Sequence, residues 1–144
     1  MYKPKNFSIN ELVHPQIIKA IGEINCWRRL QADSLKDLQT IRDDWFKKTG
    51  SGVYCNRLDI GIDSRGLRPP NDPDGSYYST HKQGGTFDLE PTNGDHIGFW
   101  EFVYELIKEG KLGYLNTMES RTFTPTWTHV GYMNTNEKPL VIEP

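Results

Sequence analysis

The chain has 144 residues and a mass of 16.6 kDa, a length typical of one domain with a modest hydrophobic core. Hydrophobic residues make up 35% of it and the mean hydropathy is −0.68, with no uninterrupted apolar run long enough for a membrane-spanning helix. The net charge of −2 argues against general nucleic-acid binding, because such proteins usually carry a basic excess. We therefore expect a soluble single domain over residues 1–144, with no nucleic-acid partner and no integral membrane segment.

Two features predict where the protein is made. The first residues, Met1 to Asn6, contain no apolar stretch of the kind that forms a secretory signal peptide. The cysteines, Cys26 and Cys55, are too few for a disulfide scaffold and lack the spacing of a metal-binding pair. We expect synthesis in the cytoplasm without a signal peptide, with both thiols reduced and at least partly buried.

Helical patterns dominate the N-terminal third of the chain. Ser8 and Glu11 have the spacing of a capping box, which predicts a short helix directly after Ser8. Pro15 suits the first turn of a second helix, whose apolar side carries three isoleucines. Ser34 predicts the start of a longer helix, which keeps its apolar spacing until the Gly-rich segment 49–52 ends it.

The middle of the chain changes from helical to extended patterns. The alternation of Leu58, Ile60 and Ile62 predicts a strand. Residues 63–78 are rich in proline and glycine and contain two arginines, so we expect a loop there. A further strand is expected around Asp88.

The C-terminal half contains one helix between strands. An apolar stripe predicts a helix over residues 95–109, which ends at Gly110. Two short strands are expected over 114–119 and 127–133, and the segment 137–144 is either an ordered strand or a loose tail. Helices followed by strands with one inserted helix predict an α+β fold with a small, mostly antiparallel sheet flanked by helices.

The strongest chemical pattern lies in residues 79–88, which read Ser-Thr-His-Lys-Gln-Gly-Gly-Thr-Phe-Asp. His81 lies at the end of the expected loop, two glycines allow close approach of the backbone, and Asp88 follows on the expected strand. A neutral imidazole and a carboxylate are both suitable zinc ligands, and a turn between them could bring both to one ion.

This decapeptide resembles the S-x-H-x-x-G-x-A-x-D signature of the zinc D-alanyl-D-alanine carboxypeptidases and endopeptidases. They belong to the LAS metallopeptidases, whose fold is shared by the Hedgehog signalling domain. Ser79, His81, Gly84 and Asp88 match at the family spacing, and Thr86 replaces the family alanine. The match is tight over about ten residues, and the order of the predicted elements agrees loosely over most of the chain. The resemblance implies a Hedgehog-type fold.

The third zinc ligand of that family is a histidine near the C-terminus, commonly beside a tryptophan. Trp127-Thr128-His129 is the matching segment, and no later histidine exists in the chain. The resemblance therefore implies a Zn²⁺ ion held by His81, Asp88 and His129, with the fourth position left to water, as in catalytic zinc sites. The alternative is that His129 is an ordinary strand histidine and Asp88 a turn residue.

The resemblance also implies substrate-binding residues. In the family, an arginine from the loop before the motif holds the free carboxylate or acyl-linked end of the peptide. Arg68 fits that place best and Arg65 is the fallback, since a guanidinium fork suits a planar carboxylate. Ser79, the first residue of the motif, is the second residue assigned to substrate binding. Tyr77 and Tyr78 beside it either line a cleft or are exposed turn residues.

The chain departs from the family pattern at the general base. Family members often place a glutamate three residues before the last zinc histidine, or a histidine two residues before it, where this chain has Thr126 and Trp127. If the last two expected strands form a hairpin, Glu119 faces His129 with Cβ atoms roughly 5 Å apart. Glu119 would there accept a proton as the catalytic base. A register slip of one residue would turn Glu119 away, and Glu90 is a weaker candidate.

These features predict a zinc-dependent metallopeptidase that hydrolyses a D-Ala-containing peptide bond of bacterial peptidoglycan as a D,D- or L,D-peptidase. Its partner would be a peptidoglycan stem peptide or a small D-Ala-containing dipeptide. The missing family glutamate motivates a second hypothesis, a catalytically impaired, zinc-stabilised binding or structural module. A third hypothesis is a metal-free interaction domain.

A peptidoglycan enzyme without a signal peptide resembles the bacteriophage endolysins, which a holin releases to the cell wall. A virion-borne lysis protein or a cytoplasmic dipeptidase are the alternatives, and the oligomeric state is left open.

Overall fold

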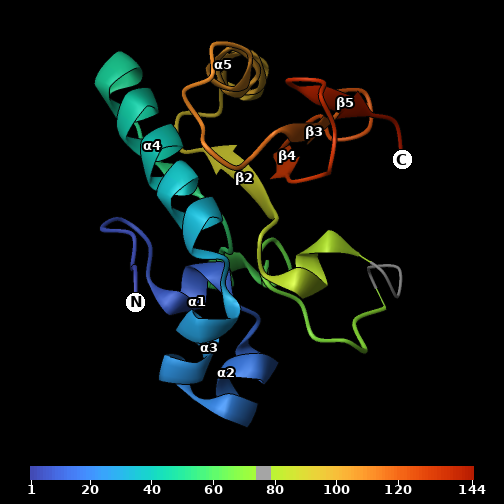
Figure 1. The fold of residues 1–144 in the computed structure, drawn as a ribbon. Coiled ribbons are helices and arrows are strands. Elements are labelled where there is room, and N and C mark those ends of the chain that lie inside the picture. Colours follow the sequence, from blue (N-terminus) through green and yellow to red (C-terminus); the bar gives the residue numbers. More distant parts are fainter. Residues whose placement is uncertain (74–78) are drawn as a thin grey trace.

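The computed structural model describes residues 1–73 and 79–144, so Tyr77 and Tyr78 lie outside the described residues. Within these ranges the chain has the predicted α+β fold, with helices before the first strand and one helix inserted between later strands (Figure 1). The helices are α1 (Ile9–Leu12), α2 (Pro15–Ile21), α3 (Glu23–Arg29), α4 (Ala32–Thr49) and α5 (His96–Lys108).

The N-terminal helices follow the predicted capping signals with one exception. At α1 the Glu11 side chain accepts a hydrogen bond from the Ser8 backbone N–H at 2.7 Å, as the capping box requires. The long helix α4 begins at Ala32, so Ser34 lies inside the helix and not at its N-cap. Ser34 is buried, and its hydroxyl donates to the Gly85 carbonyl at 2.8 Å, so a tertiary contact explains this serine.

The prediction of a strand over residues 58–62 is wrong. Leu58–Ile60 form a 3₁₀ turn, and the first strand is β1 (Val53–Tyr54), which comes earlier in the chain. Leu58 and Ile60 are 44% and 56% exposed, so their alternation has no core to face. Gly61 then adopts a φ of 78°, which reverses the chain and ends the turn.

The sheet is mixed: most neighbouring strands are antiparallel, as predicted, and one pair is parallel. The strands are β1, β2 (Phe87–Pro91), β3 (Thr117–Glu119), β4 (Thr128–Gly131) and β5 (Leu140–Ile142), in the order β1-β2-β4-β3-β5. All neighbours are antiparallel except β3 and β5. Because β2 already occupies the other side of β4, β5 takes the free edge of β3, and the chain reversal after β4 makes β5 parallel to β3. The segment 137–144 therefore contains an ordered strand.

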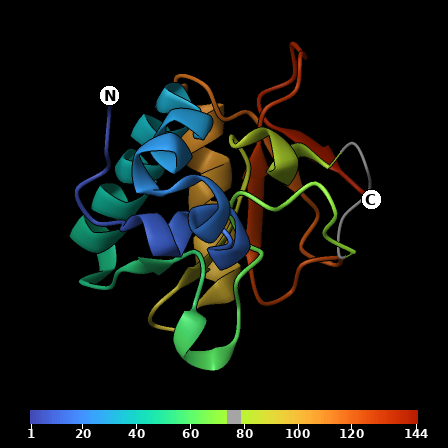
Figure 2. The same cartoon turned by 90° about the horizontal axis from the view of Figure 1, so that it is seen from below.

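Helix α5 lies between α4 and the sheet (Figure 2). Trp45 of α4 packs edge-on against Phe99 of α5 with ring centroids 5.1 Å apart, and both side chains are almost fully buried. Aromatic pairs of this kind supply much of the buried area of a small core. The helices thus cover one side of the sheet, and the strands β2 and β4 hold its centre.

A buried carboxylate fixes the segment that leads into β3. The two oxygens of Asp37 in α4 accept hydrogen bonds from the backbone N–H groups of Gly113, Tyr114 and Leu115, at 2.9, 2.7 and 2.7 Å. These charge-assisted bonds satisfy donors that would otherwise be unpaired at the end of a loop. The start of β3 is thereby tied to the long helix.

None of the helices in the described ranges is long and apolar enough to cross a membrane. Cys26 and Cys55 are both free and buried, as the sequence predicts. Burial is the main reason that the pKa of the Cys55 thiol is raised far above its ordinary value, which keeps that thiol protonated.

Candidate metal centre

The candidate metal centre starts from the pairing of β2 with β4. In this register Asp88 lies directly opposite His129. Its neighbours Phe87 and Leu89 are fully buried, and because side chains alternate along a strand, Asp88 points to the opposite face of the sheet. Residues 41 positions apart in the sequence are thus brought together by one backbone ladder.

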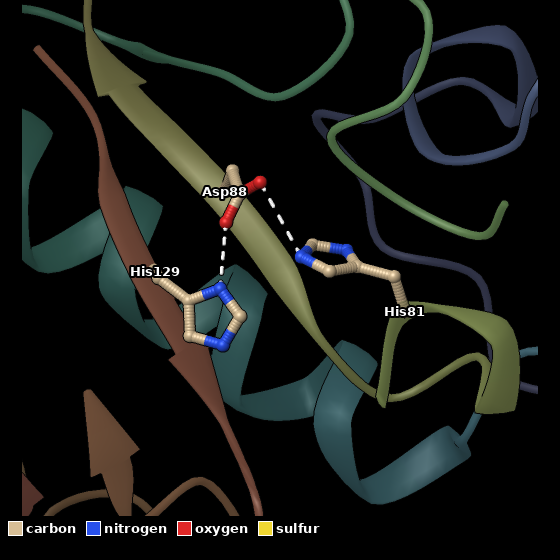
Figure 3. Close-up of side chains that lie close together, drawn as sticks. All are labelled: His81, Asp88 and His129. Carbon is tan, nitrogen blue, oxygen red and sulfur yellow. Dashed lines mark hydrogen bonds and ion pairs between the residues drawn. The ribbon is translucent and has the colours of Figure 1, made fainter. Parts of the chain in front are cut away.

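Each oxygen of the Asp88 carboxylate faces one imidazole (Figure 3). Oδ1 lies 2.8 Å from Nδ1 of His129, and Oδ2 lies 3.3 Å from Nε2 of His81. The three residues are 3–8% exposed. Figure 3 shows both rings turned toward the carboxylate from different elements, so the three ligand atoms converge on one point.

A backbone carbonyl orients His81. The residue lies in the 3₁₀ turn η2 (Thr80–Gln83), and its Nδ1 is 3.1 Å from the Gly66 oxygen. Because a carbonyl only accepts, Nδ1–H of His81 donates to it, and Nε2 is the ring atom that faces Asp88. This is the arrangement that orients histidine ligands in metal sites. Gly66 approaches the chain so closely that a Cβ there would lie 2.0 Å from the Leu12 oxygen.

The glycine of the motif is required by space as well as by conformation. Gly84 has a φ of 80°, and a Cβ on it would lie 2.2 Å from the Arg29 carbonyl oxygen. Its own carbonyl accepts from the Gln31 N–H at 2.9 Å, and the next residue, Gly85, accepts from Ser34. The turn between His81 and Asp88 is therefore clamped to the start of α4.

The departure from the family alanine is accommodated across the sheet. Thr86 lies close to Gly131 of β4, and a Cβ on that glycine would come within 2.8 Å of the Thr86 hydroxyl oxygen. The missing side chain on β4 leaves the room that the threonine methyl and hydroxyl occupy. Thr86 is thus compatible with the strand that carries Asp88.

The charge on Asp88 is strongly favoured. Burial acts to raise the pKa of this carboxyl, but the positive charge of His81 and hydrogen bonds from His129 and His81 outweigh it. The net result is a pKa far below the ordinary value for aspartate. The carboxylate is therefore available as an anionic ligand over the physiological pH range.

The donor set fits a zinc ion. One nitrogen from each histidine and one carboxylate oxygen all lie within 4.8 Å of one another. Tetrahedral zinc with bonds of about 2.0 Å separates its ligands by roughly 3.3 Å, and the His81–Asp88 distance is 3.3 Å. Two imidazoles and a carboxylate are also the ligand types of catalytic zinc sites. The structure thus brings together the three predicted ligands.

Glu119 lies beside these ligands, at the C-terminal end of β3. The pairs Thr117–Gly131 and Met118–Val130 set the β3–β4 register, which continues to the Glu119–His129 position. The Oε1 atom of Glu119 is 3.7 Å from Nδ1 of His129. The Trp100 indole of α5 donates to the Glu119 carbonyl at 2.9 Å and holds the end of the strand.

The predicted substrate residues Arg68 and Ser79 line the same pocket. The Nη2 atom of Arg68 is 3.2 Å from Oδ2 of Asp88, so the guanidinium contacts a ligand as well as the pocket. Its Nε donates to the Ser64 carbonyl. Arg68 is thereby held in a defined position next to the centre.

The two fallback residues pair with each other. Nη1 of Arg65 lies 2.7 Å from Oε2 of Glu90, and both side chains are mostly buried. The Arg65 carbonyl also accepts from the Asp88 N–H at 2.7 Å, which supports β2 beside the ligand. The ion pair therefore gives Arg65 and Glu90 a structural role beside β2.

The pocket around the centre has a volume of about 410 Å³. Its walls include residues that sequence reasoning did not assign to the site. The sequence places Trp127 beside His129 without indicating that it lines a pocket, and Ile142 belongs to β5, for which the apolar run 140–142 is the only local signal. The lining residues outside the predicted set are Thr80, Thr117, Trp127, Gly131, Tyr132, Met133, Ile142 and Pro144.

Comparison of this chain with known protein families, with curated proteins and with solved structures gave no match. The resemblance to the D-Ala-D-Ala peptidases, the Hedgehog-type fold included, therefore stays a prediction that rests on the motif and on the geometry of this centre.

Proposed function

We propose that the protein is a zinc-dependent metallopeptidase that hydrolyses a D-Ala-containing peptide bond of bacterial peptidoglycan. The observation that carries the proposal is the convergence of His81, Asp88 and His129 at the floor of an open pocket, with Glu119 beside them. Ligands contributed by one 3₁₀ turn and two strands leave one side of the centre facing the pocket. Catalytic zinc sites have such an open side, whereas structural zinc sites are closed by a fourth protein ligand.

Zinc held by these three residues would supply a Lewis acid, which lowers the pKa of a water and polarises a carbonyl. Glu119 would accept the proton of the attacking water at Oε1 and deliver it to the leaving amine. Its place beside His129 supports this role, because a general base must lie within reach of the reacting water.

Arg68 and Ser79 would bind the peptide at the edge of the pocket. The fork of Arg68 suits a planar carboxylate or an acyl oxygen of the substrate. Because the same guanidinium contacts Asp88, a substrate bound by Arg68 would lie next to the metal ligands. Binding at this place would offset part of the entropy cost of bringing the substrate and the catalytic groups together.

Two measurements test the proposal. Zinc content after purification without chelator, by inductively coupled plasma mass spectrometry, should be near one per chain. The zinc-loaded protein should then cleave peptidoglycan stem peptides, and digestion of the same peptides by a known D,D-peptidase in parallel is the positive control. A chain that stays metal-free when zinc is offered contradicts the proposal.

A zinc-stabilised binding module is the second candidate function. The observation in its favour is that Thr126 and Trp127 stand where the related peptidases often have their base. Zinc binding together with stem-peptide binding and no turnover would favour this second function.

A further inference from the structure

A second pocket of about 240 Å³ adjoins the metal pocket. Its walls come from the end of α3, from η2 and from the segment that precedes β3. Thr80 and Tyr132 line both pockets, so the two cavities share a wall. We call this second cavity the basic pocket.

Two arginines give the basic pocket positive charge. Arg28 and Arg29 line it, both residues are exposed, and no acidic side chain lines it among the residues that the structure describes. Guanidinium groups without carboxylate partners favour the binding of carboxylates, which they hold by charge-assisted hydrogen bonds. Within the described parts of the chain, the arginines in ion pairs are at other positions, namely Arg42, Arg57, Arg65, Arg68 and Arg121.

The opposite wall of the basic pocket is held in place by fixed contacts. Tyr114 and Tyr132 stack with ring centroids 4.6 Å apart, and the Gln31 amide donates to the Tyr114 hydroxyl at 3.4 Å. The Asp37 carboxylate fixes the backbone of Tyr114, and Gln31 holds Gly84 of the motif. The basic pocket is thus formed by the contacts that also position the zinc motif.

The cavity also continues on the other side of the centre. A third pocket of about 300 Å³ shares Arg68, Asp88 and Trp127 with the metal pocket. The metal pocket thus adjoins two further cavities at different residues, and these offer room for parts of a peptide beyond the reacting bond. This arrangement favours a substrate longer than a dipeptide.

We propose that the basic pocket is a subsite for the substrate, in which Arg28 and Arg29 bind a carboxylate on a residue of the peptide beyond the scissile bond. The inference rests on the proposed peptidase function and adds a substrate class to it. Peptides with an acidic residue at the position that reaches the basic pocket are the favoured substrates, and their amide counterparts are poorer ones.

The first test uses pairs of synthetic peptides that contain a D-Ala bond and differ only by glutamate or glutamine at one position, one to three residues from that bond. We expect the zinc-loaded wild type to prefer the glutamate member of at least one pair by on the order of tenfold in kcat/KM, mainly through KM. The double variant Arg28→Ala, Arg29→Ala should lose this preference and keep its zinc. Lys47→Ala, which removes an exposed charge on α4, is the matched control. Equal rates for both members of every pair, or an unchanged preference in the double variant, would overturn the subsite.

The second test needs no turnover. N-acetyl-glutamate and N-acetyl-glutamine are titrated separately into ¹⁵N-labelled protein, and amide shifts are followed at Arg29, Gln31 and Gly85. The acid should shift these amides in the wild type and not in the double variant, and the glutamine compound should have little effect. A shift without any peptide cleavage supports the basic pocket and counts against the peptidase, whereas cleavage without the shift or the preference does the reverse.

Discussion

At the residue scale, the candidate centre depends on Asp88. Its two oxygens each face one of the two histidines, and Arg68 approaches the same carboxylate at 3.2 Å. The pKa of Asp88 lies below the ordinary range because partner charges outweigh the effect of burial. The side chains of His81, His129 and Arg68 therefore meet at this one carboxylate.

Replacing Glu119 by glutamine tests its role as the base. The amide cannot accept the proton, so we expect a loss of turnover of about 10² to 10⁴-fold. Zinc content should stay unchanged, because Glu119 is not among the three convergent ligands. Glu105→Gln, at an exposed position of α5, serves as the control. A fully active Glu119→Gln variant would remove Glu119 as the base.

At the element scale, each ligand is held by an element that another element supports. The turn η2 is tied to α4 through Gln31 and Ser34, and β3 is tied to α4 through Asp37 and to α5 through Trp100. The start of α4 and its Asp37 therefore hold both the segment after η2 and the segment that leads into β3. Changes at these contacts should alter metal binding as well as stability.

Gly84→Ala separates conformational strain from steric overlap. The left-handed conformation costs an alanine about 1–2 kcal/mol, and the added Cβ would also overlap the Arg29 carbonyl. Gly110→Ala is the matched control, because Gly110 has a φ of 72° with nothing within 4 Å of its Cβ position. We expect Gly84→Ala to lower the free energy of unfolding by more than Gly110→Ala and to weaken zinc binding. Equal losses in urea unfolding would contradict the close packing of this turn.

The pair Thr86 and Gly131 should behave as a coupled unit. Gly131→Ala alone places its Cβ against the Thr86 hydroxyl and should destabilise the protein by about 1–3 kcal/mol. Adding Thr86→Ala, the residue of the family signature, removes the overlapping atoms and should recover most of that loss. The measurement is a double-mutant cycle by urea denaturation. Simple additivity of the two changes would show that the residues do not compete for space.

At the scale of the whole molecule, the centre draws on one 3₁₀ turn, the strand β2 that closely follows it, and the strand β4 much later in the chain. A metal ion bound by all three would link these parts, and because it binds the folded chain preferentially, it adds to stability. The mixed sheet places β5 next to β3, so the C-terminal segment also forms part of the pocket wall.

Zinc removal should therefore lower the melting temperature. With free zinc at about a thousand times its Kd, the linkage adds about 4 kcal/mol to the free energy of unfolding. Calorimetry with zinc and with a chelator measures the difference, and Asp88→Asn should show little response to either. A wild-type melting temperature that does not depend on zinc would contradict a site formed by these three ligands.

The sequence by itself determined the α+β fold class, the helices α1, α2 and α5, and the three residues that meet at the candidate metal centre. Capping residues, apolar periodicity and the spacing of the motif are local properties of the chain, so they can be read directly. Leu58 and Ile60 show the limit of this approach, since the same alternation fits an exposed turn when no core lies opposite. The pairing of β3 with β5, the role of Ser34 and the contacts of Arg68 were decided only by the tertiary structure. Each depends on which surfaces are left free once the other elements have packed, and this is not encoded in any one segment.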